Sequence, residues 1–577
     1  MKKVTLYFAA LLFFLLPLKF GGLAVMPESG GFYPENLTDC FFITWPPHAL
    51  AYFGSALLVM AVIAYREKLN LKLSLFALVW SILPALAVIP GVIRGDWIIA
   101  LAQWSLLLGC GSVIMAASII LNKEPEKGRL FIGALLFGSV FTAFLGWDQH
   151  LYSLDEMRKF VAEQEALGIP VSESMRLKLT DPRVFSTLAS SNALASLLMI
   201  MSIIGFYMSG VWSRKITPPE TAKWIMRGFF LLLFVSVLLL TRSRSALFCP
   251  VAAGVLALFS TDKIKWKWRI AGLTAGIVML VVGAFAAAAA GRGFASMGER
   301  ADYLRTSAVV TWRYPLIGSG WGGFFKNHMQ MKFSDVQETA RDPHNVVAAF
   351  SSQCGIPAGS IMLFVLIFPL VLLWKYRFEK SLQGTVFWCG VIFTIHSLID
   401  CDWQVPALIT VMGVLYTAAL SDVHEDKKSA FPVWSAALPL ALAACGTTWF
   451  YTAGDMALTR LQDKVNPSTP EMVQKYAHYS VEMLAKEAEK YRPNQANIPI
   501  FCGDWYMKTR DLRRAEDYYR KALELDPFRP AVCIRLARIA LLENDEQKAE
   551  ELVMQAQKLF PKSNKYSMEK LRMDLKL

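Results

Sequence analysis

Charged residues are scarce in this chain of 577 residues: Asp, Glu, Lys and Arg make up 18% of it, whereas an ordinary soluble domain holds about 25%. The hydrophobic fraction is 55% and the mean hydropathy is +0.38. Such hydrophobicity excludes an intrinsically disordered chain, and so much apolar surface cannot all be buried in one soluble globule. Length and composition together favour a polytopic membrane protein.

Several catalytic and metal-binding motifs are also absent from the sequence. There is no CxxC pair, no His or Cys cluster with zinc spacing, no Walker loop, no GxGxxG after a predicted strand, no HExxH and no GxSxG. The nine cysteines are irregularly spaced, and several lie in apolar runs. Cys502 and Cys533 lie in a polar tail and can pair only if that tail is outside the cytoplasm.

Apolar runs of roughly 20 residues are abundant, and each predicts a transmembrane helix. The thirteen predicted spans are 4–21, 47–64, 73–93, 97–121, 130–148, 185–210, 226–241, 244–260, 270–290, 355–374, 383–400, 404–421 and 431–452. The first begins Met1-Lys2-Lys3 and resembles a signal peptide, but no Ala-x-Ala site follows it, so we interpret it as an uncleaved span. The span 226–241 is short and could pair with its neighbour as a hairpin.

The net charge of +13 has two sources. With a cytoplasmic N-terminus, the short inside loops together with Lys2 and Lys3 hold 21 cations, whereas the short outside turns hold almost none, as the positive-inside rule requires. Two long outside loops, 149–184 and 291–354, carry charge that this rule does not explain. The odd number of spans predicts a membrane domain over 1–452 and places residues 453–577 in the periplasm.

The tail is polar, helical in pattern and repetitive. Pro493, Pro527 and Pro561 are 34 residues apart, and several alanines share that period. This spacing is typical of tetratricopeptide repeats, with units at about 501–534 and 535–568. Such an array either caps the membrane domain or offers a docking surface to a protein partner. The fold class predicted for the whole chain is therefore all-α.

Polar residues at membrane depth indicate function, because burying them in lipid is costly. They occur at four outer-face positions: Arg183 with Asn192, Arg242 with Arg244, the loop 291–354 with its arginines and His344, and His396 with Asp400 and Asp402. Each position also has a structural interpretation, as an interfacial arginine or a helix-packing polar residue.

His344 is the strongest candidate for acid–base chemistry, because histidine alone titrates near neutrality without perturbation. An isolated histidine is more often structural. His396 and Asp400 are four residues apart, so we expect them to share a helix face and orient one another. Asp400 and Asp402 alone are too few ligands to predict a metal ion.

Five short motifs follow one another between residues 183 and 421. They are Arg183 with Ser191-Asn192-Ala193; Ser243-Arg244-Ser245-Ala246; Arg300 with Pro315-Leu-Ile-Gly318; His344-Asn345 with Gly355 and Gly359; and His396 with Asp400, Asp402 and Pro406. Taken in order, they resemble the signature of the O-antigen ligase and O-antigen polymerase superfamily, which includes protein O-oligosaccharyltransferases. Ser191 stands in place of the family's proline and Ser245 in place of its glycine, which leaves the subfamily open.

The resemblance implies a GT-C-type membrane glycosyltransferase. It would transfer a glycan from undecaprenyl diphosphate to an acceptor hydroxyl outside the cytoplasm, with inversion and without metal or other cofactor. His344 would be the general base, and the donor diphosphate would be bound by Arg183, Arg244, Arg300 and Arg242. Supporting roles would fall to Asn192, Asn345, His396, Asp400 and Asp402.

Alternatives within and beyond this family stay open. The acceptor is a lipid A core, a growing glycan or a protein hydroxyl, and the repeat tail favours the last by analogy. A lipid-linked glycan flippase or exporter would use the same arginines only to bind diphosphate. A membrane scaffold presenting the repeats is a third class. We expect the lipid bilayer and a lipid-linked glycan as partners, and no nucleic acid.

Overall fold

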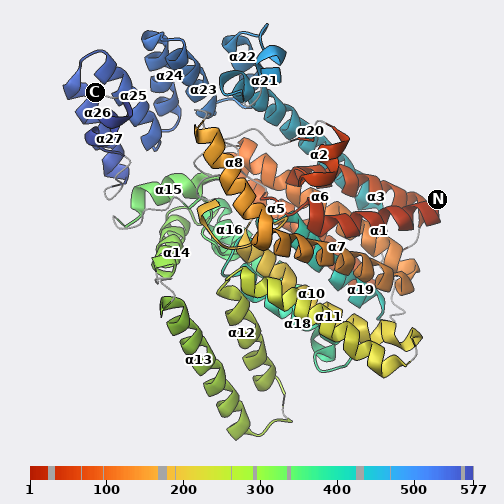
Figure 1. Ribbon diagram of the computed structural model, residues 1–577. Coiled ribbons are helices and arrows are strands. Elements are labelled where there is room, and N and C mark those ends of the chain that lie inside the picture. Colours follow the sequence, from red (N-terminus) through yellow and green to blue (C-terminus); the bar gives the residue numbers. More distant parts are fainter. Residues whose placement is uncertain are drawn as a thin grey trace.

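Helices form nearly all of the regular structure in this computed structural model (Figure 1). The structure describes residues 1–23, 33–34, 36–65, 68–94, 97–166, 179–188, 190–216, 218–261, 263–289, 295–333, 340–423, 434–467, 470–560 and 566–575. No β-strand occurs in these residues, which confirms the all-α class. Parts of both long predicted loops, and the first residues of the last predicted span, lie outside the described residues.

The chain up to the repeats contains α1 (Lys2–Lys19), α2 (Leu37–Phe42), α3 (Leu50–Ala64), α4 (Leu71–Ser81), α5 (Leu83–Arg94), α6 (Trp97–Lys123), α7 (Gly128–Asp148), α8 (Leu154–Ala166), α10 (Ser191–Trp212), α11 (Pro219–Leu240), α12 (Ser245–Phe259), α13 (Trp266–Ala289), α14 (Ala295–Arg313), α15 (Gly323–Met331), α16 (Val346–Cys354), α17 (Ile356–Leu373), α18 (Leu382–Ser397), α19 (Pro406–Ser421) and α20 (Trp434–Val465). The remaining helices are α21 (Pro470–Lys475), α22 (Val481–Tyr491), α23 (Asn497–Lys508), α24 (Leu512–Leu525), α25 (Pro530–Leu542), α26 (Glu546–Leu559) and α27 (Met568–Leu575).

Seven helical segments of the described chain are long and apolar enough to cross a membrane: Pro47–Ala64, Leu71–Arg94, Trp97–Lys123, Pro125–Gln164, Ser191–Trp212, Pro219–Leu240 and Ile356–Tyr376. Two shorter apolar helices are Phe248–Phe259 and Pro406–Ser421. The other four predicted spans fall on α1, α13, α18 and α20. Each predicted span therefore coincides with helical structure, as expected of a polytopic membrane protein.

Local chemistry explains where helices and predicted spans differ. The span 73–93 is divided at Ile82 into α4 and α5, because Pro84 has no N–H to donate to the preceding turn. The span 185–210 starts later than expected, since the Ser190 side chain accepts the Ala193 N–H and caps α10 there. The short span 226–241 belongs to a helix that begins at Pro219 and is long enough to cross a membrane by itself, so the span is longer than predicted.

Helix α6 lies at the centre of the membrane bundle. Of the residues in its 18-residue apolar stretch, 94% are buried. It packs against α3, α4, α5, α19 and α20. Helix α1 packs against α7, α3 and α19, so the signal-like N-terminal segment is part of the bundle. In Figure 1, α12 and α13 extend away from the main group of helices.

Helix α20 joins the membrane bundle to the repeats without a break. The predicted boundary at residues 452 and 453 falls inside it. It packs on α3 and α6 as well as on α22 and α23, and Ala437, Leu440, Ala441 and Ala444 in its first half belong to the core of the membrane bundle. Ala457, Leu458 and Leu461 of α20 belong to the apolar core of the repeat region. The tail is therefore carried on a continuous helix rather than a flexible linker.

The repeats are helix pairs, as predicted. Helix α23 packs on α24 and α25 on α26, so the units begin a few residues before the predicted positions 501 and 535. Gly503 faces the Tyr519 ring, where an added Cβ would lie 2.5 Å from a ring carbon. Cys502 and Cys533 are buried free thiols. The last repeat approaches α15, because Lys332 Nζ lies 3.6 Å from the centroid of the Phe560 ring (Figure 1).

A buried ion pair fixes the first repeat helix to α20. Arg492, which ends α22, donates from NH2 to Asp455 Oδ1 at 2.6 Å, and the two side chains are 1% and 4% exposed. Tyr33 donates to the other oxygen of Asp455 at 2.8 Å and lies 3.0 Å from His48 Nε2. Three parts of the chain thus meet at Asp455.

We expect Arg492→Met to loosen this junction, because it leaves the Asp455 carboxylate buried without its cation, at a cost of about 3–5 kcal/mol. Thermal unfolding and limited proteolysis of the purified protein measure the effect, with exposed Arg513→Met as the matched control. The double variant Arg492→Met/Asp455→Leu should recover much of the loss. Equal stability of the Arg492→Met and Arg513→Met proteins would show that the pair does not hold the junction.

Candidate functional site

Asp400 lies in the short loop between α18 and α19, and its side chain is 4% exposed. Asn192 Nδ2 donates to Asp400 Oδ2 at 2.6 Å, and Arg300 NH2 lies 3.4 Å from the same oxygen. The other carboxylate oxygen lies 3.4 Å from His344 Nδ1. Because a buried carboxylate is stable only with donors around it, Asp400 holds together α10, α14 and the segment before α16.

The backbone around His344 is fixed by neighbouring side chains. Asp342 Oδ1 accepts the His344 N–H at 2.8 Å, an Asx turn, and Gln404 donates to the other Asp342 oxygen at 2.6 Å. This turn supports the φ of 54° at His344, which is uncommon for a residue with a side chain. Asn345 caps α16, and its amide donates to Leu398 O at 2.8 Å.

His344 remains accessible although it is anchored. Its side chain is 35% exposed, and its ring stacks on Tyr303 with centroids 5.9 Å apart. Burial alone would lower the pKa of His344, but the hydrogen bond and charge of Asp400 outweigh burial and raise the pKa above its ordinary value. Burial raises the pKa of Asp342 to about 6, against the opposing effect of His344.

A second hydrogen-bonded chain starts at Asn192 and ends at a buried His–Asp pair. Its links are Ser243 Oγ to Asn192 Oδ1 at 2.8 Å, Ser243 Oγ to Ser245 Oγ at 2.7 Å, Ser245 Oγ to His396 Nε2 at 2.8 Å and His396 Nδ1 to Asp402 Oδ2 at 2.7 Å. His396 and Asp402 are 0% and 2% exposed. This pair is closed to a substrate and is linked to Asn192 by hydrogen bonds through the two serines.

The expected pairing of His396 with Asp400 is wrong. Helix α18 ends at Ser397, and no hydrogen bond joins the His396 and Asp400 side chains among the described contacts, although the Asp400 N–H still donates to His396 O at 2.9 Å. His396 bonds Asp402 instead, while Asp400 turns toward His344. The two carboxylates of the Asp-x-Asp motif therefore serve different histidines.

Of the predicted arginines, Arg300 reaches the Asp400 cluster. Arg183 instead bonds Asp181, with Nε 2.7 Å and NH2 2.6 Å from Oδ2. Arg242 acts electrostatically on the same Asp181 carboxylate.

The turn between α11 and α12 carries the other two predicted arginines. Arg242 and Arg244 are exposed there, on either side of Ser243, which bonds Asn192. The Val184 N–H donates to Leu240 O at 3.4 Å, which places the Arg183 segment beside this turn. Three arginines thus lie on two chain segments next to the cluster, and no direct bond from Arg183 to the cluster occurs among the described contacts.

The glycine-rich motif at 315–323 supports α16 and α17. Gly318 has a φ of 69°, and a Cβ there would lie 2.2 Å from the Gln353 carbonyl carbon. Gly355 has a φ of 93°, and a Cβ there would lie 2.3 Å from Leu316 O. Only glycine permits this backbone contact, which fixes the far end of the helix that follows His344.

Three side chains of the site carry possible metal-ligand atoms that lie near one another. One ligand atom each from His344, Asp400 and Cys401 lie within 4.8 Å of one another. Nitrogen, oxygen and sulfur ligands suit zinc. The positive charge of Arg300, 3.4 Å from Asp400, opposes a divalent cation at this position.

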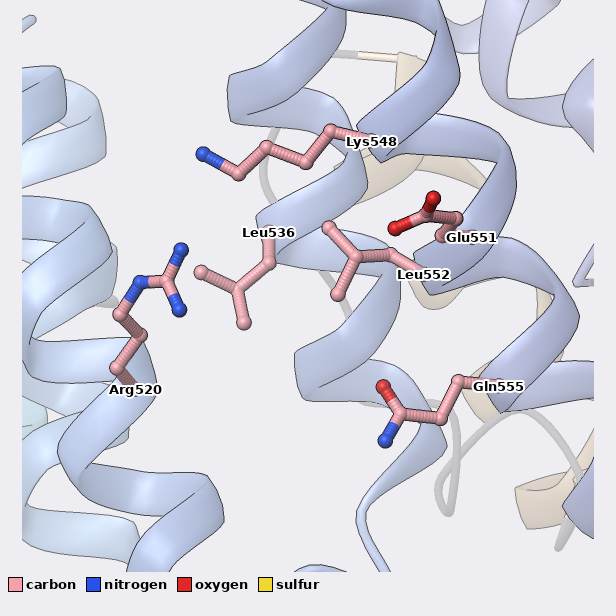
Figure 2. Close-up of a pocket in the computed structure, with 6 residues that line it drawn as sticks. All are labelled: Arg520, Leu536, Lys548, Glu551, Leu552 and Gln555. Carbon is pink, nitrogen blue, oxygen red and sulfur yellow. The ribbon is translucent and has the colours of Figure 1, made fainter.

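A separate pocket lies in the repeat region. Figure 2 shows its lining residues, Arg520, Leu536, Lys548, Glu551, Leu552 and Gln555. Arg520 and Lys548 both bond Glu516, at 2.6 and 2.8 Å, so the cations of this pocket already have an acidic partner. None of the candidate site residues is among those that line it.

Two segments of the chain match known protein families. Residues 228–363 match the family model described as O-antigen ligase, and residues 484–570 match a tetratricopeptide repeat model. A search of curated proteins found no match. Together with the apolar helices, the matches support a membrane protein with a segment similar to O-antigen ligases and a helical tail similar to tetratricopeptide repeats. The resemblance to an O-antigen ligase with a tetratricopeptide tail is confirmed over these two segments.

The ligase match includes Arg242, Arg244, Arg300 and His344, whereas Asn192 and Asp400 lie outside it. The fold brings Arg300 and His344 of the matched segment together with Asn192 and Asp400 in one cluster.

Sequence reasoning did not single out Asp342 or Tyr303. The Asp342-Pro343-His344 sequence is typical of an Asx turn, and Tyr303 stands three residues after Arg300, on the same helix face. Both signals were present in the sequence, but neither residue is unusual in a polar loop.

Proposed function

We propose that the chain transfers a glycan from undecaprenyl diphosphate to an acceptor hydroxyl at the outer face of the bacterial inner membrane. The observation that carries this proposal is the pair of half-exposed His344 and buried Asp400, with Nδ1 and Oδ1 3.4 Å apart. An accessible imidazole held by a buried carboxylate is the arrangement that general-base catalysis requires.

His344 is the general base in this proposal. Nδ1–H is donated to Asp400, so Nε2 carries the lone pair and takes the proton of the acceptor hydroxyl. Asp400 fixes the tautomer and stabilises the imidazolium that forms, as carboxylates do in other His–Asp pairs. The Tyr303 ring holds the imidazole plane.

The transfer is a direct displacement. The acceptor oxygen forms a bond to the anomeric carbon as the bond from that carbon to the diphosphate oxygen breaks. The proton passes to His344, and undecaprenyl diphosphate leaves with the bonding electron pair. One displacement inverts the anomeric configuration and needs no metal if fixed cations stabilise the leaving group.

Those cations are the arginines at the edge of the cluster. Arg300 lies beside Asp400, and Arg183, Arg242 and Arg244 stand on two neighbouring segments. Guanidinium groups bind phosphate oxygens in pairs. Asn192 and Asn345 hold Asp400 and the start of α16, and the buried His396–Asp402 pair orients Asn192.

The proposed topology places the N-terminus in the cytoplasm and the repeat tail in the periplasm. The distribution of lysine and arginine supports it. The contact of Lys332 with Phe560 supports a tail on the same side as the loop that carries His344.

His344→Gln removes the ring nitrogen that accepts the proton but keeps a polar side chain. We expect transfer to fall by about 10²–10⁴-fold, while binding of undecaprenyl diphosphate stays near the wild-type value because the arginines remain. Transfer from a lipid-diphosphate-linked glycan by the purified protein measures this, with exposed His478→Gln as the matched control. Undiminished transfer by the His344→Gln protein contradicts the assignment of the base.

The acid limb of the pH–rate profile should report His344, because only the unprotonated ring accepts a proton. Asp400 raises the pKa of His344, so Asp400→Asn should move this limb to lower pH and also lower the maximal rate. The pH dependence of kcat/KM for both proteins tests the sign, with exposed Asp517→Asn as the control. A limb that stays in place, or moves to higher pH, means that Asp400 does not control the base.

A further inference from the structure

Helix α14 carries functional side chains toward two different neighbours. Arg300 and Tyr303, three residues apart, reach Asp400 and His344. Asp302 turns instead toward α15. The rotation of α14 about its own axis therefore determines two positions at once: that of Arg300 relative to Asp400, and that of Tyr303 relative to His344.

The contact with α15 is a buried His–Asp pair. His328 Nε2 lies 3.1 Å from Asp302 Oδ2, and both side chains are 0% exposed. Arg305 donates to the other Asp302 oxygen from Nε at 3.0 Å and from NH2 at 2.7 Å, and NH2 also bonds Met331 O at the end of α15. A buried carboxylate needs such donors.

Ring contacts continue from this pair to the site. The His328 ring stacks on Phe324 at 5.8 Å and meets the Tyr303 ring edge-on at 5.1 Å. Tyr303 in turn stacks on His344 at 5.9 Å. Tyr303, 2% exposed, is thus held between the buried histidine and the accessible one.

His328 is suited to a fixed rather than a reacting role. Burial lowers the pKa of His328, against the opposing effect of Asp302, so the ring is neutral and its Nε2–H is the donor to Asp302. Its Nδ1 is buried without a hydrogen-bond partner among the described residues. Because the ring is 0% exposed, a substrate does not reach it.

We propose that Asp302 and His328 are positioning residues for glycosyl transfer: their hydrogen bond locks the rotation of α14, and thereby holds Arg300 against Asp400 and Tyr303 against His344. This inference rests on the proposed function and adds two residues to it. Neither residue touches the reacting atoms. Displacement of a catalytic group by about 1 Å costs about 10²-fold in rate, which is the scale of the effect expected when the hydrogen bond is lost.

Two substitutions at one position separate the hydrogen bond from ring packing. His328→Phe keeps a ring between Phe324 and Tyr303 but removes the donor to Asp302. His328→Gln loses the ring but keeps an amide N–H at the position of Nε2. We expect the Phe variant to lose about 10–100-fold in transfer, and the Gln variant to stay within about threefold of wild type.

The opposite pattern, an active Phe variant and an inactive Gln variant, would assign His328 to packing alone and overturn the proposal. Equal activity of the two variants, high or low, also overturns it. If the Phe variant does not fold, as judged by thermal unfolding, Asp302→Asn takes its place. The amide keeps one acceptor oxygen for donors from two residues, His328 and Arg305, so an intermediate loss supports the proposal and wild-type transfer contradicts it.

His344→Gln, assayed beside these variants, separates this inference from the proposed function. If the wild-type protein shows no transfer, the proposed function itself fails; if His344→Gln retains transfer, the assignment of the base fails whatever the His328 variants do. If His344→Gln loses transfer and His328→Phe does not, the positioning role alone is wrong. The assay uses the full-length protein and a lipid-diphosphate-linked glycan.

Discussion

The buried carboxylate of Asp400 is the group on which the geometry of the site depends. A charge at that depth needs donors, and its donors come from parts of the chain that are distant in sequence: Asn192 of α10, Arg300 of α14 and His344 before α16. The loop after α18 thereby brings the proposed diphosphate-binding arginine and the proposed base to one point. The Asx turn of Asp342 and the cap at Asn345 then fix the orientation of His344.

Three His–Asp pairs surround this point, and exposure separates their roles. His396 with Asp402, and His328 with Asp302, are buried and closed to a substrate. His344 is 35% exposed, so it alone of the three offers a ring nitrogen to an acceptor hydroxyl. In the proposed mechanism the buried pairs position Asn192 and α14, and neither pair contacts the reacting atoms.

Much of this could be predicted from the sequence, because apolar runs, a 34-residue period and polar residues at membrane depth are local signals. They indicated the helical membrane domain, the repeats, His344 and Asp400. These local signals could not show which histidine is hydrogen-bonded to which aspartate. His396 and Asp400 are four residues apart, but α18 ends at Ser397, and the end of a helix depends on tertiary contacts. Asp302 and His328 are ordinary residues of a charged loop, and only the fold shows that they are buried together. The helix that carries the repeats is continuous through residue 465, although the change in composition suggested a boundary near residue 452.

The central claim is that a base held by Asp400 drives one direct displacement at the anomeric carbon. The most direct test is the anomeric configuration of the product, measured by NMR after the purified protein acts on a lipid-diphosphate donor of defined configuration. A single displacement predicts an inverted linkage in all of the product. A retained linkage would require two displacements and a covalent or equivalent intermediate, and would contradict the proposed roles of His344 and Asp400.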